Sequence, residues 1–87
     1  MENDLKKVQN IGKETARKLN EVGIDSFETL VHIGTENVFK KLQSKNPNSC
    51  INLLYSIEGA IEGIKWNEIS KERKFELIAF FNNNRLQ

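Results

Sequence analysis

The stretch VQNIGKETARKLNEVGI, Val8–Ile24, decides the fold, because it places a tight turn on each side of a short helix. Asn10 and Gly12 are residue types that tolerate positive φ, so the segment before the helix is typical of a turn. Apolar spacing predicts the helix over about Lys13–Val22. Gly23 is then placed for a left-handed C-terminal cap. The stretch therefore predicts a helix-hairpin-helix unit, two short helices joined by a tight turn.

Residues typical of helix starts and ends recur along the rest of the chain, and no segment shows the alternation of apolar and polar residues that is typical of a strand. The segment 50–64 carries apolar residues three and four apart over its whole length, so we expect it to be the central helix. The fold class expected is all-α, a compact bundle of five or six short helices within one domain, 1–87. The other expected helices are a first one with Leu5 and Val8, one starting at Asp25 or Ser26 and closed near Gly34, one capped by Thr35, and one capped by Ser70.

Size and composition limit the classes of function. The chain has 87 residues with 29% charged residues and a net charge of +1, so binding to nucleic acid would have to rest on a local basic patch. Its longest apolar run, Leu77–Phe81, is far shorter than the ~20 residues that span a bilayer. A single cysteine and no visible secretory signal lead us to expect a cytoplasmic protein without membrane contact.

The hairpin is the first candidate binding site. The free N–H groups and positive dipole end of the helix after such a turn can hold a phosphate oxygen. Weak, sequence-independent DNA binding is one interpretation; a purely structural bend is the other, favoured by Glu14 next to the cations. Glu14 and Lys18 are four apart and are expected to pair. The candidate DNA-binding residues are Asn10, Gly12, Lys13, Arg17, Lys6 and Lys18.

A protein partner or a homodimer is the alternative to DNA. Gly59 and Gly63 lie four apart on the central helix, where each costs about 1 kcal/mol relative to alanine, so we expect another backbone to approach closely there. Trp66 is expected to cover the end of the core. Phe80 and Phe81 point about 100° apart on a helix, so one of them can be exposed. These five residues are the candidate protein contacts.

No arrangement of residues favours an enzyme, a metal site, a cofactor or a small-molecule substrate. His32 is the only histidine, and no cysteines or acidic residues surround it at metal-ligand spacing. Cys50 falls in the apolar stripe of the central helix, where we expect it to be buried and inert. We therefore expect a non-enzymatic domain.

Glu58 and Glu62 form a pair of carboxylates four apart on the central helix. A metal site in a helical bundle would also need Glu-x-x-His partners, and the sequence has none. We expect this pair on the solvated face of the helix, or as partners for Lys65 and Arg73.

Several segments occur in one order along the chain: Asn10-Ile11-Gly12, Gly23-Ile24, Ile33-Gly34, Val38-Phe39-Lys40 with Leu42, Asn52-Leu53-Leu54-Tyr55, Glu58-Gly59-Ala60-Ile61-Glu62-Gly63 and Trp66-Asn67. Their order and spacing resemble the C-terminal domain of the TfoX (Sxy) family of competence regulators, over nearly the whole chain. The resemblance implies a helix-hairpin-helix core like that of SAM domains. It also implies a role in bacterial competence and transcription regulation, through contact with DNA or with protein.

Two departures from the family pattern accompany this resemblance. The sequence has Gly34-Thr35 where Gly-Ala is common in the family. It also lacks the separate N-terminal α/β domain that usually precedes this domain, so we expect a lone module.

Overall fold

A computed structural model describes residues 5, 8 and 10–84, and these residues form helices and no strand. The predicted all-α class is confirmed, and the predicted helices agree closely with those observed. The short helix expected around Leu5 and Val8 falls mainly on residues outside the described ones. The elements are α1 Lys13–Glu21, α2 Phe27–Ile33, α3 Thr35–Lys45, α4 Ile51–Glu62, the 3₁₀ helix η2 Trp66–Glu68, and α5 Lys71–Asn83.

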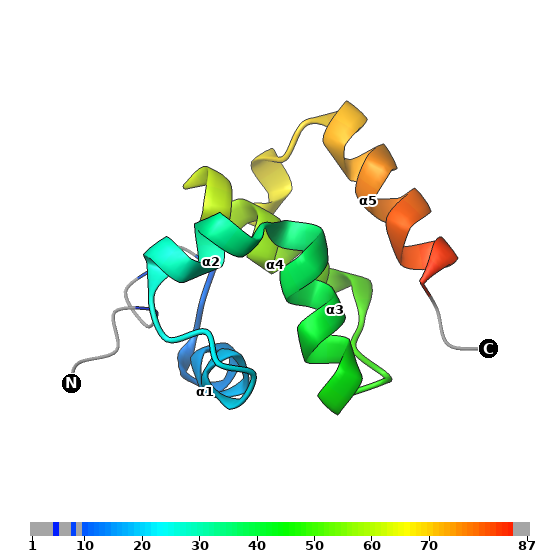
Figure 1. The fold of residues 1–87 in the computed structure, drawn as a ribbon. Coiled ribbons are helices and arrows are strands. Elements are labelled where there is room, and N and C mark those ends of the chain that lie inside the picture. The colour runs from blue at the N-terminus through cyan, green and yellow to red at the C-terminus, as the bar shows by residue number, and fades with distance from the viewer. Residues whose placement is uncertain (1–4, 6–7, 9, 85–87) are drawn as a thin grey trace.

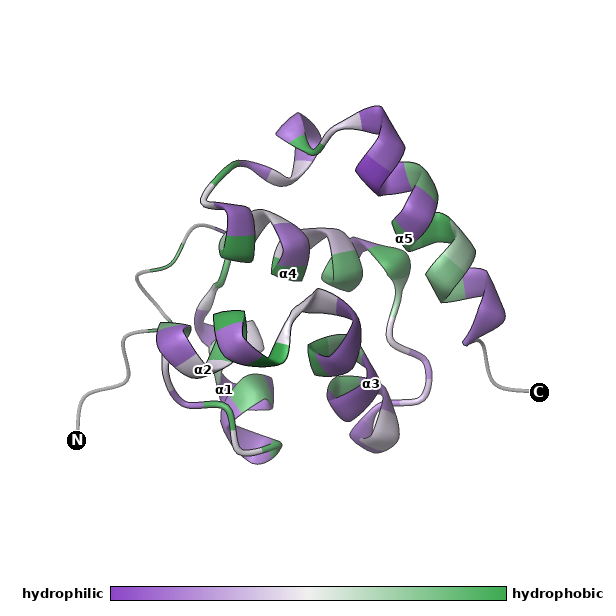
Figure 2. Ribbon diagram, turned by 45° about the horizontal axis from the view of Figure 1, so that its top comes forward, coloured by the Kyte–Doolittle hydropathy of each residue, from purple (hydrophilic) through white to green (hydrophobic). Residues whose placement is uncertain are grey.

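Helix α4 lies at the centre of the molecule, as its apolar pattern predicts. It packs against α3, α2, η2 and α5. Helices α1 and α2 lie on one side of the α3–α4 pair and α5 lies on the opposite side (Figure 1). The apolar residues of α4 face α2 and α3 (Figure 2). Each α-helix contributes at least one fully buried side chain to the core, for example Leu19, Leu30, Phe39, Ile57 and Leu77.

Local hydrogen bonds fix most of the helix ends where the sequence places them. The Oγ atoms of Ser26 and Ser70 accept hydrogen bonds from backbone N–H groups three residues later, each at 3.1 Å. Gly23 has φ +85°, and the N–H of Ile24 donates to the carbonyl of Leu19 at 2.9 Å. This is the Schellman arrangement that Gly23-Ile24 predicts.

Thr35 does not cap α3, so that prediction is wrong. Gly34, with φ +89°, occupies the cap position, and Thr35 is the first residue of the helix. The Thr35 hydroxyl instead donates to Oε1 of Glu58 at 2.7 Å. A contact with the central helix has thus replaced a local cap.

None of the helices in the described part of the chain has the length and apolar character needed to cross a bilayer.

Candidate functional site

The turn before α1 is tied to the far end of α4 by the side chain of Asn10. Asn10 has φ +70°, as expected for a residue in place of glycine. Its Nδ2 donates to the carbonyl of Ile64 at 2.7 Å. A Cβ on Gly59 would lie 2.3 Å from this Nδ2 and 2.9 Å from the Ile64 oxygen. The close approach expected at Gly59 is therefore confirmed, and the Asn10 amide points into the protein.

Gly63 differs from Gly59. A Cβ on Gly63 would meet no atom within 4 Å, so the close approach expected there is wrong. Gly63 has φ +75° and ends α4, and the N–H of Ile64 donates to the carbonyl of Gly59 at 2.9 Å. A left-handed helix end explains this glycine.

The cation best placed beside the turn is already paired. Arg17 donates to the carboxylates of Glu14 and Glu21 on its own helix, and its bond to Glu14 lowers the Glu14 pKa. The predicted pairing of Glu14 with Lys18 is therefore wrong. Lys13 is exposed at the start of α1. The turn thus offers an exposed Lys13 next to an arginine held by two acids.

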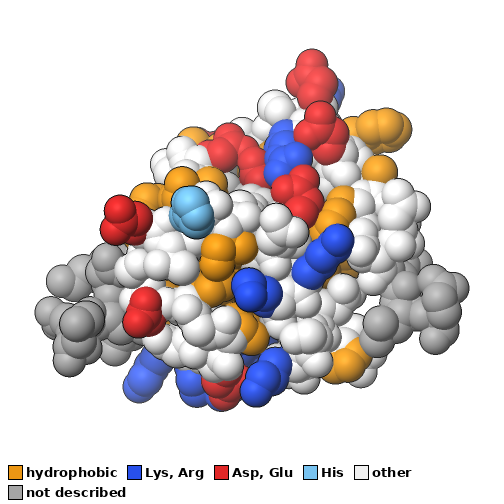
Figure 3. Space-filling model, in the orientation of Figure 1, with side chains coloured by type: hydrophobic (Ala, Val, Ile, Leu, Met, Phe, Trp, Pro, Cys, Tyr) orange, Lys and Arg blue, Asp and Glu red, His pale blue; other side chains and the backbone are white. Residues whose placement is uncertain are grey.

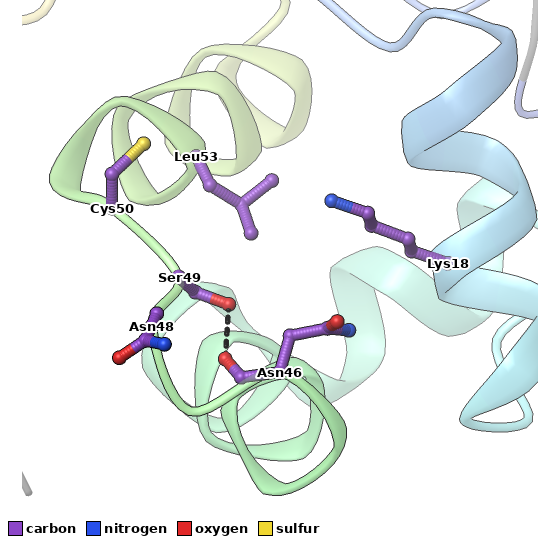
Figure 4. A pocket seen from close by; sticks show the side chains of 6 residues that line it. All are labelled: Lys18, Asn46, Asn48, Ser49, Cys50 and Leu53. Carbon is purple, nitrogen blue, oxygen red and sulfur yellow. Dashed lines mark hydrogen bonds between the residues drawn. The ribbon is translucent and has the colours of Figure 1, made fainter.

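Lys18 lies apart from this turn. Its side chain extends from α1 toward Leu53 of α4 (Figure 4). It helps to line a hollow of about 300 Å³ with Leu53 and with residues 46 and 48–50, and the Ser49 hydroxyl donates to the carbonyl of Asn46 at 2.7 Å. Lys6, the remaining predicted cation, lies outside the described residues. The structure thus places Gly12, Lys13 and Arg17 together without Lys18.

Cys50 is exposed, so the expectation that it is buried is wrong. It occupies the cap position just before the first residue of α4. Its side chain is therefore outside the apolar stripe that begins with the helix itself.

A buried carboxylate joins α3, α4 and α5. Glu58 is only 6% exposed, so the solvated face expected for it is wrong. Arg73 Nη2 donates to Glu58 Oε1 at 3.0 Å, which confirms the predicted partner. Burial opposes ionisation of Glu58, but hydrogen bonds from Arg73, Glu62 and Thr35 outweigh it and hold the Glu58 pKa below its usual value. Arg73 also pairs with Glu36 and Glu76, and Figure 3 shows such acidic and basic side chains gathered near the start of α5.

Glu62 has its pKa raised from the usual 4.5 to about 7, chiefly by its hydrogen bond to Glu58, with further contributions from partial desolvation and from the negative charge of Glu58. An acid whose pKa is raised by folding contributes stability below its unfolded pKa, and this contribution is lost as pH rises through the folded pKa. The free energy of unfolding of the parent protein should therefore fall as the pH rises from about 5 to about 8. We expect this fall to be smaller in Glu62→Gln. Because Glu62 is exposed, the change should stay below about 1 kcal/mol.

Urea unfolding across this pH range measures the effect. Glu72→Gln is the control, because Glu72 is exposed and forms no ion pair with another described residue. Parallel pH profiles for Glu62→Gln and the parent protein would refute the prediction.

The exposed aromatic residues are not the ones expected. Phe80 and Phe81 both pack on Phe39, and their ring centroids lie 6.2 and 6.0 Å from the ring centroid of Phe39. Neither of them therefore provides the exposed ring that their adjacency allows. Phe75 is instead 76% exposed. It lies two residues before the buried Leu77, about 200° around the helix, which is the sequence signal for its outward position. Sequence reasoning missed this residue.

Trp66 is 49% exposed at the start of η2, so it covers the end of the core only in part. The Nζ atom of Lys74 lies 5.9 Å from the ring centroids of both Trp66 and Tyr55. This cation links η2 and α4 to α5. Among the described residues, no three His, Cys, Asp or Glu side chains are grouped to hold a metal ion.

Comparison with known proteins identifies the family. The model of the TfoX C-terminal domain matches residues 1–81. Two solved structures from Listeria monocytogenes are similar, an uncharacterized protein in a triclinic form and a protein of unknown function in a tetragonal form. Each has a TM-score of 0.89 and 30% sequence identity over 91% of this chain, and the match covers 90% and 98% of the Listeria chains. No curated protein matches. The chain belongs to the TfoX C-terminal domain family.

Proposed function

We propose that this domain is a non-enzymatic protein-interaction module and that its hairpin is architectural. The observation that carries the proposal is the α5 face, which we define as Phe75, Ile78 and Ala79. All three are exposed, and their spacing of three and four residues puts them on one side of the helix. Exposed apolar residues grouped on one helix face are typical of surfaces that bind other proteins.

The hairpin supports this choice because its groups are used within the chain. Asn10 donates its amide to Ile64, and Arg17 is held by Glu14 and Glu21. Glu14 also lies in the first turn of α1, where it competes with a phosphate for the positive end of the helix. Figure 3 shows acidic side chains among the basic ones along the α1 edge. Such a surface attracts DNA weakly.

We infer the cellular role of this module from its family. The TfoX C-terminal domain is a regulatory type of domain. We therefore place the module in bacterial competence and transcription control, in the cytoplasm, where it acts as an adaptor or an oligomerisation unit. It uses no cofactor and no small-molecule substrate.

A DNA titration tests the architectural role of the hairpin. We expect no binding to fluorescent duplex or single-stranded DNA up to about 100 µM protein at about 50 mM salt, a range that covers typical non-specific affinities. Fluorescence anisotropy is the measurement. Lys13→Glu removes the exposed cation at the turn, and Lys45→Glu is the control on α3. Salt-sensitive binding that disappears in Lys13→Glu, but persists in Lys45→Glu, would overturn the proposal.

A further inference from the structure

We infer that the partner of the α5 face is a second copy of this chain, joined head to tail, with Phe75 of one copy seated on helix α2 of the next. The inference rests on the proposed function, because it names the occupant of the α5 face. It is carried by two different surfaces of one molecule, a projecting aromatic side chain and an apolar hollow.

The hollow lies on α2. It has a volume of about 600 Å³ and is lined by Phe27, Glu28, Val31 and His32. Val31 is 43% exposed, which is high for a large apolar residue. Figure 3 shows hydrophobic side chains beside the pale blue histidine of α2 on this face. The hollow, defined here as the α2 hollow, is thus a shallow site, open to solvent, that is lined by two apolar side chains, an acid and a histidine.

The projecting group is Phe75, the most exposed large hydrophobic side chain of the described residues. Ile78 is also exposed, one turn further along α5. The buried Leu77 holds α5 to the core, so the helix presents Phe75 from a fixed base. An aromatic anchor on a rigid helix that enters an apolar hollow is a common centre of a protein interface.

The helices that carry the two surfaces lie on opposite sides of the α3–α4 pair. In both ribbon views α2 and α5 are separated by the α3–α4 pair (Figures 1 and 2). Contact between different surfaces of identical chains is heterologous, and each added copy leaves one face free at each end. The arrangement therefore predicts chains or rings rather than a closed two-fold dimer.

Charges around the two surfaces are complementary. Lys71 and Glu72 precede Phe75 by four and three residues, so they lie on the same side of α5. The α2 hollow carries Glu28 and His32. Lys71, Glu72 and Glu28 take part in none of the ion pairs among the described residues. Lys71 can therefore pair with Glu28 of the next copy when Phe75 is seated.

A two-fold contact of α5 with α5 would fit these observations less well. It would leave the α2 hollow empty and would bring together only two large exposed side chains per copy. The head-to-tail contact uses both apolar surfaces and brings Lys71 of one copy to Glu28 of the next.

Sedimentation velocity of the full chain tests the inference by complementation. We expect the weight-average mass to rise above the monomer value of 10.0 kDa as protein concentration increases. Phe75→Glu and Val31→Glu should each remain monomeric, because each has lost one face. An equimolar mixture of the two variants should form a heterodimer of twice the monomer mass and nothing larger, because each variant retains the face that the other has lost. Lys45→Glu, on α3, should associate like the parent protein.

Both substituted side chains are at the surface, and circular dichroism confirms that each variant is folded. A parent protein that stays monomeric at about 1 mM, which corresponds to contacts weaker than about 4 kcal/mol, would overturn the inference. Association that is lost in Phe75→Glu but unchanged in Val31→Glu would overturn it in favour of an α5–α5 dimer. A different protein bound at Phe75 would overturn the inference and leave the proposed function standing, whereas DNA binding through Lys13 would overturn the proposed function.

Discussion

Replacing Arg73 by leucine is expected to lower the free energy of unfolding by about 2–4 kcal/mol, because it leaves the Glu58 carboxylate buried without its cation. Breaking a fully buried ion pair typically costs 3–5 kcal/mol. The Arg73 side chain is 25% exposed, and solvent reduces the cost below the upper part of that range. Thr35 would remain a donor to Glu58, and so would Glu62 while it is protonated. Urea unfolding at neutral pH measures the effect.

The matched control is Arg17→Leu. Arg17 also pairs with two acids, but all three side chains are largely exposed, so the loss should be much smaller than that of Arg73→Leu. In acid, Glu58 becomes neutral and the penalty of Arg73→Leu should shrink. The double variant Arg73→Leu/Glu58→Leu should recover part of the lost stability, because it removes the unpaired charge. Equal losses in Arg73→Leu and Arg17→Leu would show that the buried site does not hold α5.

Gly59→Ala is expected to destabilise the fold by about 1–3 kcal/mol, although alanine favours a helix by about 1 kcal/mol. The new Cβ would lie 2.3 Å from Asn10 Nδ2 and 2.9 Å from the Ile64 oxygen. The Asn10 amide would have to leave, and its hydrogen bond to Ile64 would be lost. Chemical unfolding monitored by circular dichroism measures the change.

A double-mutant cycle identifies the cause of this loss. Asn10→Gly keeps the positive φ accessible and removes the side chain that the new Cβ meets. Gly59→Ala should therefore cost less in the Asn10→Gly background than in the parent. The Ile64 oxygen should account for the remainder. Gly12→Ala is the control, with no atom within 4 Å of its Cβ and an expected cost below about 1 kcal/mol. Additive effects at Asn10 and Gly59 would contradict the proposed contact.

Local sequence patterns predicted the helices because their determinants lie within a few residues of one another. Ser26 and Ser70 bond to N–H groups three residues away, and Gly23 permits the backbone angle that ends α1. The 50–64 pattern predicted the central helix because its apolar stripe is packed on several sides. These features require no knowledge of distant segments.

The contacts that decide how the candidate site is built connect residues far apart in sequence. Asn10 bonds to a carbonyl 54 residues away, and Thr35 to a carboxylate 23 residues away. Spacing alone could identify Asn10 as a residue that tolerates positive φ, but it could not reveal that its amide turns inward. It could place Glu58 near Arg73, but the depth of burial depends on how α3 and α5 close over α4.

The exposed aromatic was missed for a different reason. The side chains of adjacent residues on a helix point about 100° apart, so two adjacent phenylalanines can both contact one large neighbour. For Phe80 and Phe81 that neighbour is Phe39. Helical spacing relative to the buried Leu77 places Phe75 on the opposite side. The deciding information was which residue of α5 faces the core.

Photo-crosslinking in the native cells tests most directly which surface this domain uses. A benzophenone amino acid replaces Phe75 in one variant and Lys13, beside the hairpin, in the other. We predict a protein adduct from position 75 and neither a protein nor a nucleic-acid adduct from position 13. Nucleic acid captured at position 13, with nothing captured at position 75, would contradict the account.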